Sequence, residues 1–133
     1  AALIIDYGHG KSAIGETLQA VHQHAFCDPL SDPGKADLTA HVDFGAFAHQ
    51  LRSGGATTSG PVTQSAFLGA IGIRERTQQL LKTASAEARA DVMSATVRLT
   101  DPAQMGELFK VMVATSPEMP KLAGFESWAE DTC

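Results

Sequence analysis

The chain has 133 residues and a mass of 14.0 kDa, which suits one small domain or part of a larger one. Hydrophobic residues make up 44% of it, enough to bury a core. Its formal net charge of −5 leaves no basic surplus to neutralise phosphates, so nucleic acid and anionic membrane surfaces are excluded as general partners. No apolar stretch approaches the roughly 20 residues of a membrane span.

The sequence opens on a continuous apolar run, Ala1-Ala2-Leu3-Ile4-Ile5. Such a run is typical of a strand buried inside a sheet, so we expect residues 2–6 to form an interior strand. Polar and glycine residues follow directly, from Asp6 to Gly10, and mark the carboxyl edge of an α/β sheet, where ligands bind. An interior strand needs neighbours on both sides and nothing precedes this one, so we expect the first half of the domain to lie outside this sequence.

The next elements are a short strand and a helix. Alternation predicts a strand near residues 17–21, and Asp-Pro pairs predict a turn-rich loop from 27 to 36. Asp43 is placed as the N-cap of a helix whose apolar face is Phe44, Phe47 and Leu51.

The second half of the chain is predicted to contain four helices between two strands. We expect an edge strand at 57–64, a short helix at 66–71 capped by Ser65, an amphipathic helix from Ile73, another helix from Ser85, a helix begun by Asp101-Pro102, a strand at 109–114 and an ordered coil from Pro117 to Cys133.

Metal chemistry is the weaker interpretation of the histidines. His22 and His24 would point to one face of a strand, which is a ligand spacing, but no local Cys, Asp or Glu completes a site. The cysteines, Cys27 and Cys133, lie in no metal or redox spacing and predict free thiols in a reducing compartment. We therefore assign no metal site, and a small metal-binding domain that uses His22, His24 and His41 is the least favoured alternative.

The stretch from Asp37 to Phe44 is richer in chemistry. Alternation would put Asp37, Thr39, His41 and Asp43 on one polar face, able to bind a cation or to move a proton. The competing interpretation gives Asp43 to helix capping and leaves the rest as a solvated face. The segment Gly8–Ser12 lacks the spacer of a phosphate loop, so it is rejected as a nucleotide site.

Several blocks, in this order, resemble the MidA family of S-adenosylmethionine-dependent methyltransferases. The most specific is Asp37-Leu38-Thr39-Ala40-His41-Val42-Asp43-Phe44. The others are Leu3-Ile4-Ile5-Asp6-Tyr7-Gly8, Thr17-Leu18-Gln19-Ala20 with His24, Pro33-Gly34, Gly60-Pro61-Val62-Thr63-Gln64 with Phe67-Leu68, Ile71-Gly72-Ile73, and Met105-Gly106-Glu107-Leu108-Phe109-Lys110-Val111. The resemblance runs from residue 1 to about residue 125.

The resemblance implies an α/β fold, the carboxyl-terminal part of a class I, Rossmann-like methyltransferase sheet. Residues 3–5 would then be its fifth strand, residues near 57–64 its sixth, and 109–114 its seventh and antiparallel strand. It also implies S-adenosylmethionine as the cofactor. The family's cofactor motifs lie upstream of the matching blocks, so we expect this chain alone to be inactive.

The family includes the mitochondrial arginine methyltransferase needed for assembly of respiratory complex I, which implies a protein substrate. Carboxylates suit a guanidinium, so the substrate-binding candidates are Asp6, Tyr7, His24, Asp37, His41 and Asp43. No residue is assigned to catalysis itself. The resemblance places the protein in a bacterial cytoplasm or in the mitochondrial matrix of a eukaryote.

A second hypothesis stays open beside the enzyme. The chain could be a non-catalytic assembly module that keeps part of the methyltransferase fold, and association into a homodimer is compatible with either hypothesis. A glycine-rich methyltransferase motif upstream would favour the enzyme.

Overall fold

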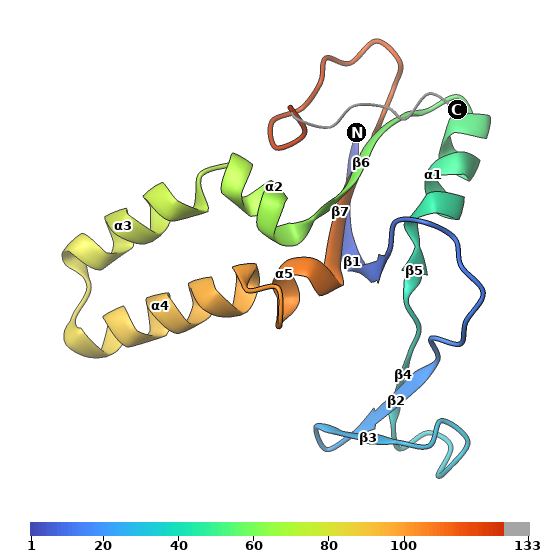
Figure 1. Cartoon of the computed structure of the whole chain (residues 1–133), viewed down its shortest axis with the longest axis horizontal. Helices are drawn as coiled ribbons and strands as arrows, with labels where there is room; N and C mark the ends of the chain where they lie inside the picture. Colours follow the sequence, from blue (N-terminus) through green and yellow to red (C-terminus); the bar gives the residue numbers. More distant parts are fainter. Residues whose placement is uncertain (127–133) are drawn as a thin grey trace.

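A four-stranded mixed sheet forms the centre of the computed structural model, which describes residues 1–126 (Figure 1). Its order is β5-β1-β7-β6, with β1 at Ala2–His9, β5 at Val42–Asp43, β6 at Thr57–Thr63 and β7 at Phe109–Thr115. β1 is parallel to β5, whereas β7 runs antiparallel to both β1 and β6. The prediction that three strands near residues 2–6, 57–64 and 109–114 share one sheet, the last antiparallel, is confirmed.

A second, three-stranded antiparallel sheet projects from the first, at the lower right of Figure 1. Its order is β3-β2-β4, with β2 at Gln19–His22, β3 at Ala25–Cys27 and β4 at Asp37–Thr39. β2 accounts for the strand predicted near residues 17–21. The chain leaves β4 and enters β5 after two residues, so the small sheet is tied directly to the main one.

Five helices complete the described part of the chain: α1 at Phe44–Ser53, α2 at Gln64–Ala70, α3 at Ile73–Thr83, α4 at Ala86–Thr100 and α5 at Met105–Leu108. α3 and α4 form a hairpin that extends away from the sheet, and neither helix has a buried residue (Figure 1). No helix among residues 1–126 is long and apolar enough to cross a membrane.

Each face of the main sheet carries its own apolar cluster. On one face, Phe44 and Ala48 of α1 pack against Met112 of β7. On the other face, Phe67 of α2 and Phe125 pack against β7, and their ring centroids are 5.4 Å apart. β7 supplies both clusters because its successive side chains point to opposite faces, and it is therefore the most buried strand described.

β1 is less buried than its apolar sequence predicts. Leu3 is 53% exposed and Ile5 is 47% exposed. β5 pairs with β1 only at Gly8 and His9, so along residues 2–7 the edge of β1 opposite β7 has no partner among the described residues. The prediction of a strand at this position is correct, but the expectation that it is fully buried is wrong for this chain.

Helix boundaries follow the predicted caps at some ends and not at others. Asp43 caps α1 as expected, and Ser85, where a helix was expected to begin, caps α4; the side chain of each accepts a hydrogen bond from the amide of the third residue after it. The cap of α2 is Thr63, whose hydroxyl accepts from the Ala66 amide at 3.3 Å, and not Ser65. Asp101 does not begin a helix. It is the C-cap of α4.

One predicted apolar face is also displaced. Phe47 was expected to be buried on α1, but it is 39% exposed, and Ala48 lies in the core beside Phe44. A small residue allows α1 to approach β7 closely at that position. The predicted coil from 117 to 133 is irregular as far as residue 126, and residues 127–133 lie outside the described part.

Candidate functional site

The candidate site lies at the carboxyl edge of β1, where β5 pairs with it. Gly8 pairs with Val42 and His9 pairs with Asp43. The two backbones are so close that a Cβ on Gly8 would stand 2.2 Å from the carbonyl oxygen of Val42. Glycine is therefore required here, and this close approach sets Asp43 beside His9.

Tyr7 forms the aromatic centre of the site. Its hydroxyl is hydrogen-bonded to the hydroxyl of Thr39, at the end of β4. Its ring meets the His41 ring edge to face at 5.9 Å between centroids, and the Phe109 ring at 5.5 Å. Tyr7 is half-buried, so these contacts fix a wall of aromatic and polar atoms against which a planar group could stack.

Asp43 supplies the charge of the site. Its Oδ1 accepts a hydrogen bond from the Ala46 amide at 2.9 Å, and its Oδ2 lies 3.7 Å from Nε2 of His9. The pKa of Asp43 is lowered, first by the Ala46 amide, then by the Ser12 hydroxyl and more weakly by a charge on His9. The carboxylate is thus held ionised, while a third of its side chain remains exposed to a ligand.

The loop after β1 lies beside this carboxylate at the start of α1, and the bend of β6 approaches that loop. A Cβ on Gly45, in the first turn of α1, would stand 3.0 Å from the carbonyl oxygen of Gly10, so the loop after β1 crosses the start of that helix. A Cβ on Gly10 would in turn stand 3.3 Å from Cγ of Pro61. The turn after β1 is therefore held between the start of α1 and the bend of β6.

The structure brings together only part of the predicted set. Tyr7 contacts His41, and Asp43 faces His9 two residues farther along β1, whereas Asp6 points to the opposite face of β1 because strand side chains alternate. The Oδ1 of Asp6 accepts a hydrogen bond from the Tyr7 amide at 2.8 Å. The expected common face from Asp37 to Asp43 is interrupted, since β4 and β5 belong to different sheets.

Two predicted residues lie on the small sheet. Asp37 is exposed on β4, opposite Val21 of β2. His24 occupies the β2–β3 turn with a positive φ of 64°. Among the contacts of the described residues, none joins either side chain to Tyr7.

Three site residues were missed by the sequence reasoning: His9, Ser12 and Thr39. His9 and Ser12 lie in the glycine-containing segment after β1, which was considered only as a phosphate loop. Thr39 was placed on the polar face but was not chosen as a contact. Its position between the candidates Asp37 and His41 was the sequence signal that could have identified Thr39 as a site residue.

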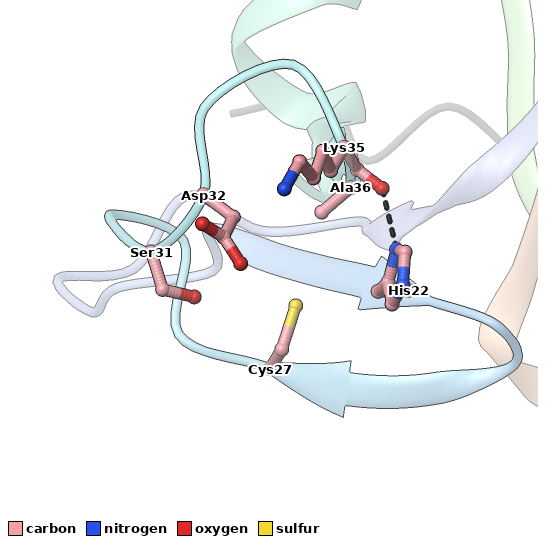
Figure 2. Close-up of a pocket in the computed structure, with 6 residues that line it drawn as sticks. All are labelled: His22, Cys27, Ser31, Asp32, Lys35 and Ala36. Carbon is pink, nitrogen blue, oxygen red and sulfur yellow. Dashed lines mark hydrogen bonds between the residues drawn. The ribbon is translucent and has the colours of Figure 1, made fainter.

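A separate pocket lies on the small sheet, lined by His22, Cys27, Ser31, Asp32, Lys35 and Ala36 (Figure 2). Nδ1 of His22 lies 2.6 Å from the carbonyl oxygen of Lys35, so the ring is held by the backbone. The Cys27 thiol is free. No group of three or more His, Cys, Asp or Glu side chains within residues 1–126 could hold a metal ion.

Sequence comparisons relate the chain to known methyltransferases. A family model of S-adenosyl-L-methionine-dependent methyltransferases, Methyltransf_28, matches residues 1–62. The mitochondrial protein arginine methyltransferase NDUFAF7 homolog of Drosophila melanogaster is 44% identical over 113 residues, which are 84% of this chain and 25% of that protein. The mitochondrial protein arginine methyltransferase NDUFAF7 of Xenopus laevis is 37% identical over 138 residues, covering 96% of this chain and 31% of that protein.

Solved structures agree with this relationship. A crystal structure from Burkholderia thailandensis with bound S-adenosyl-homocysteine is 30% identical with a TM-score of 0.85, and the match covers 98% of this chain and 36% of that one. The α/β arrangement described above is therefore that of a Rossmann-like methyltransferase. The chain spans about a quarter to a third of the length of the curated relatives it matches.

Proposed function

We propose that this chain, a relative of the MidA-type S-adenosylmethionine-dependent methyltransferases, forms the carboxyl-terminal, substrate-facing part of a protein arginine methyltransferase. The similarity to proteins named arginine methyltransferases, at 44% and 37% identity, supports the substrate class. The mitochondrial names of these relatives support the mitochondrial matrix as the location in a eukaryote, and assembly of respiratory complex I is the process we propose it serves. A bacterial protein of this type would act in the cytoplasm.

The observation that carries this proposal is the ionised Asp43, which pairs with His9 two residues beyond Tyr7, whose ring contacts His41. A guanidinium is planar, always charged and able to donate paired hydrogen bonds to a carboxylate while it stacks on a ring. Oδ1 of Asp43 is occupied by the helix, whereas Oδ2 faces His9 at 3.7 Å, which is longer than a normal hydrogen bond. A guanidinium could therefore take Oδ2 and stack on the wall that Tyr7 and His41 form.

The remaining predicted residues take outer roles in this proposal. Asp6 holds the backbone of Tyr7 through its hydrogen bond to the Tyr7 amide. Asp37 and His24, which stand on the small sheet, would contact parts of the substrate protein that flank the arginine. No residue is assigned to proton transfer, because methyl transfer depends mainly on how the accepting nitrogen is positioned.

We propose that S-adenosylmethionine, which supplies the methyl group, is bound mainly by parts of the enzyme other than these residues. A cofactor held by a glycine turn needs open space beside the glycines. Here the Val42 carbonyl fills the space beside Gly8, and Pro61 fills the space beside Gly10. The exposed Leu3 and Ile5, with the edge of β1 that has no strand partner within residues 1–126, offer a surface on which the rest of a methyltransferase sheet could pack.

Nuclear magnetic resonance can test guanidinium binding on the chain itself. Titration with N-acetylarginine amide should shift the resonances of Tyr7, His41 and Asp43, and the same concentration of N-acetylcitrulline amide, which is neutral and of similar shape, should not. Asp43→Asn should weaken the arginine response about tenfold, as expected for one charge-assisted hydrogen bond, while the fold is kept. Equal responses to arginine and citrulline would contradict the proposal and favour a non-catalytic assembly module.

A further inference from the structure

β4 is an edge strand that leads directly into the candidate site. It pairs with β2 along Asp37–Thr39, and no strand among the described residues pairs with its other side. A free strand edge presents backbone N–H and C=O groups that can pair with another extended chain. Thr39, the last residue of β4, already contacts the Tyr7 hydroxyl of the site.

The side chains of β4 do not protect this edge. Strand edges are commonly blocked by lysine, proline or a bulge, and the sequence Asp37-Leu38-Thr39 has none of these. Leu38 is 62% exposed and Asp37 is exposed beside it. The edge therefore offers an apolar contact and a negative charge to whatever pairs with it.

We propose that the substrate protein binds as an extended segment that adds a strand to the free edge of β4. Its arginine then enters the site formed by Tyr7, His41 and Asp43. The inference rests on the proposed function, and it adds how the polypeptide around the arginine is recognised. Backbone hydrogen bonds to β4 supply sequence-independent affinity, Leu38 contacts an apolar neighbour, and Asp37 favours a basic one.

Charge favours a basic peptide over a second copy of this chain as the partner of the β4 edge. Each copy has a formal net charge of −5, and pairing two β4 edges would bring two Asp37 side chains into the same three-residue ladder. Like charges close together across a strand pair are destabilising. An arginine-containing segment instead places its positive charge against Asp37 and Asp43.

The opposite edge of the small sheet provides an internal comparison. β3 is also an edge strand, and its Phe26 is 78% exposed, more than Leu38. β3 is separated from the main sheet by β2 and β4, however, and none of its residues contacts Tyr7 among the described interactions. Exposure alone would favour β3, whereas position relative to the site selects β4.

Fluorescence anisotropy can test the proposal by measuring how tightly the whole chain binds a short labelled peptide. This parent peptide has a central arginine between valine and threonine residues. Two further peptides are N-methylated on alternate backbone nitrogens, offset by one residue, so that each blocks one set of N–H donors. We expect one of them to bind about tenfold more weakly than the parent and the other to bind like the parent. If both bind like the parent, or if the parent does not bind, the strand-addition proposal is wrong.

Two variants and one neutral peptide separate this inference from the proposed function. Leu38→Lys should weaken binding of the parent peptide about tenfold. The matched Phe26→Lys on β3 should leave the affinity for this peptide unchanged. Equal effects of the two substitutions would overturn the choice of β4. The titration with N-acetylarginine amide should not change in Leu38→Lys. Replacing arginine by citrulline in the peptide tests the proposed function alone: equal affinity would remove guanidinium recognition, whatever the backbone-methylated peptides do.

Discussion

Replacing Gly8 with alanine would place a methyl group where the backbone of β5 already lies. The new Cβ would stand 2.2 Å from the carbonyl oxygen of Val42 and 3.0 Å from its carbonyl carbon and amide nitrogen. Ordinary contact begins at 3.4 Å, so β5 would have to withdraw by about 1 Å. The obstructing atoms are all backbone, and no side-chain rotation can relieve the clash.

The structure sets the size of this effect. β5 has two residues and pairs with β1 only at Gly8 and His9, so a displacement removes the whole pairing. Overpacking of this kind costs about 1–3 kcal/mol, which for a domain of this size lowers Tm by roughly 4–11 °C. Asp43 moves with Val42, and a misplacement of about 1 Å is enough to weaken guanidinium binding tenfold or more.

Calorimetric melting and the N-acetylarginine amide titration measure the two consequences on one sample. Gly15→Ala is the matched control, because a Cβ at residue 15 meets nothing within 4 Å. It should keep both Tm and binding. If Gly8→Ala melts like the control, the close pairing of β1 and β5 is not a constraint on the fold. If it melts early but binds arginine normally, the position of Asp43 does not depend on that pairing.

Three other measurements examine the core, the charge and the cofactor. Phe44→Ala empties a fully buried position and should lower the free energy of unfolding, measured with urea, by about 3–5 kcal/mol. Phe47 is partly exposed on the same helix, so Phe47→Ala should lower it by less than about 1 kcal/mol. Equal losses would contradict the packing of α1. Because the folded pKa of Asp43 is lowered, its ionised form stabilises the protein above the unfolded-state pKa of about 3.9, and this contribution is lost as pH falls through the folded pKa. Tm should therefore fall more steeply on acidification in the wild type than in Asp43→Asn, which keeps the cap at neutral pH, and parallel curves would refute this. Titration calorimetry of the chain with S-adenosylmethionine should show weak binding or none. Micromolar affinity would contradict the proposal that other parts of the enzyme bind most of the cofactor.

Local patterns predicted much of the fold. The caps at Asp43 and Ser85, and the strand over 109–114, depend on residues close in the sequence, so their signals survive without tertiary information. The antiparallel direction of the last strand in the main sheet came instead from the family resemblance. The resemblance covers positions that periodicity alone leaves ambiguous, such as residues 57–64, where Pro61 weakens the strand pattern.

Tertiary contacts account for what the sequence did not predict. The apolar run at the start of the chain indicated burial, but burial of a strand also needs a neighbour at each edge, and one edge of β1 has none along residues 2–7 in the described part of the chain, where Leu3 and Ile5 are exposed. On α1, periodicity could not decide between Phe47 and Ala48, because the distance between helix and sheet decides it. His9 became a site residue only through its pairing with Asp43.

The capping role and the binding role of Asp43 are therefore not alternatives. The helix takes Oδ1 through the Ala46 amide, and this bond fixes the direction of the whole carboxylate, so Oδ2 is turned toward His9 and the edge of β1. A guanidinium that arrives at Oδ2 does not compete with the cap. It competes with His9, which can form an ion pair only when protonated. Substrate binding and helix stability thus use different oxygens of one side chain, which is why a substitution that keeps the cap can still remove recognition.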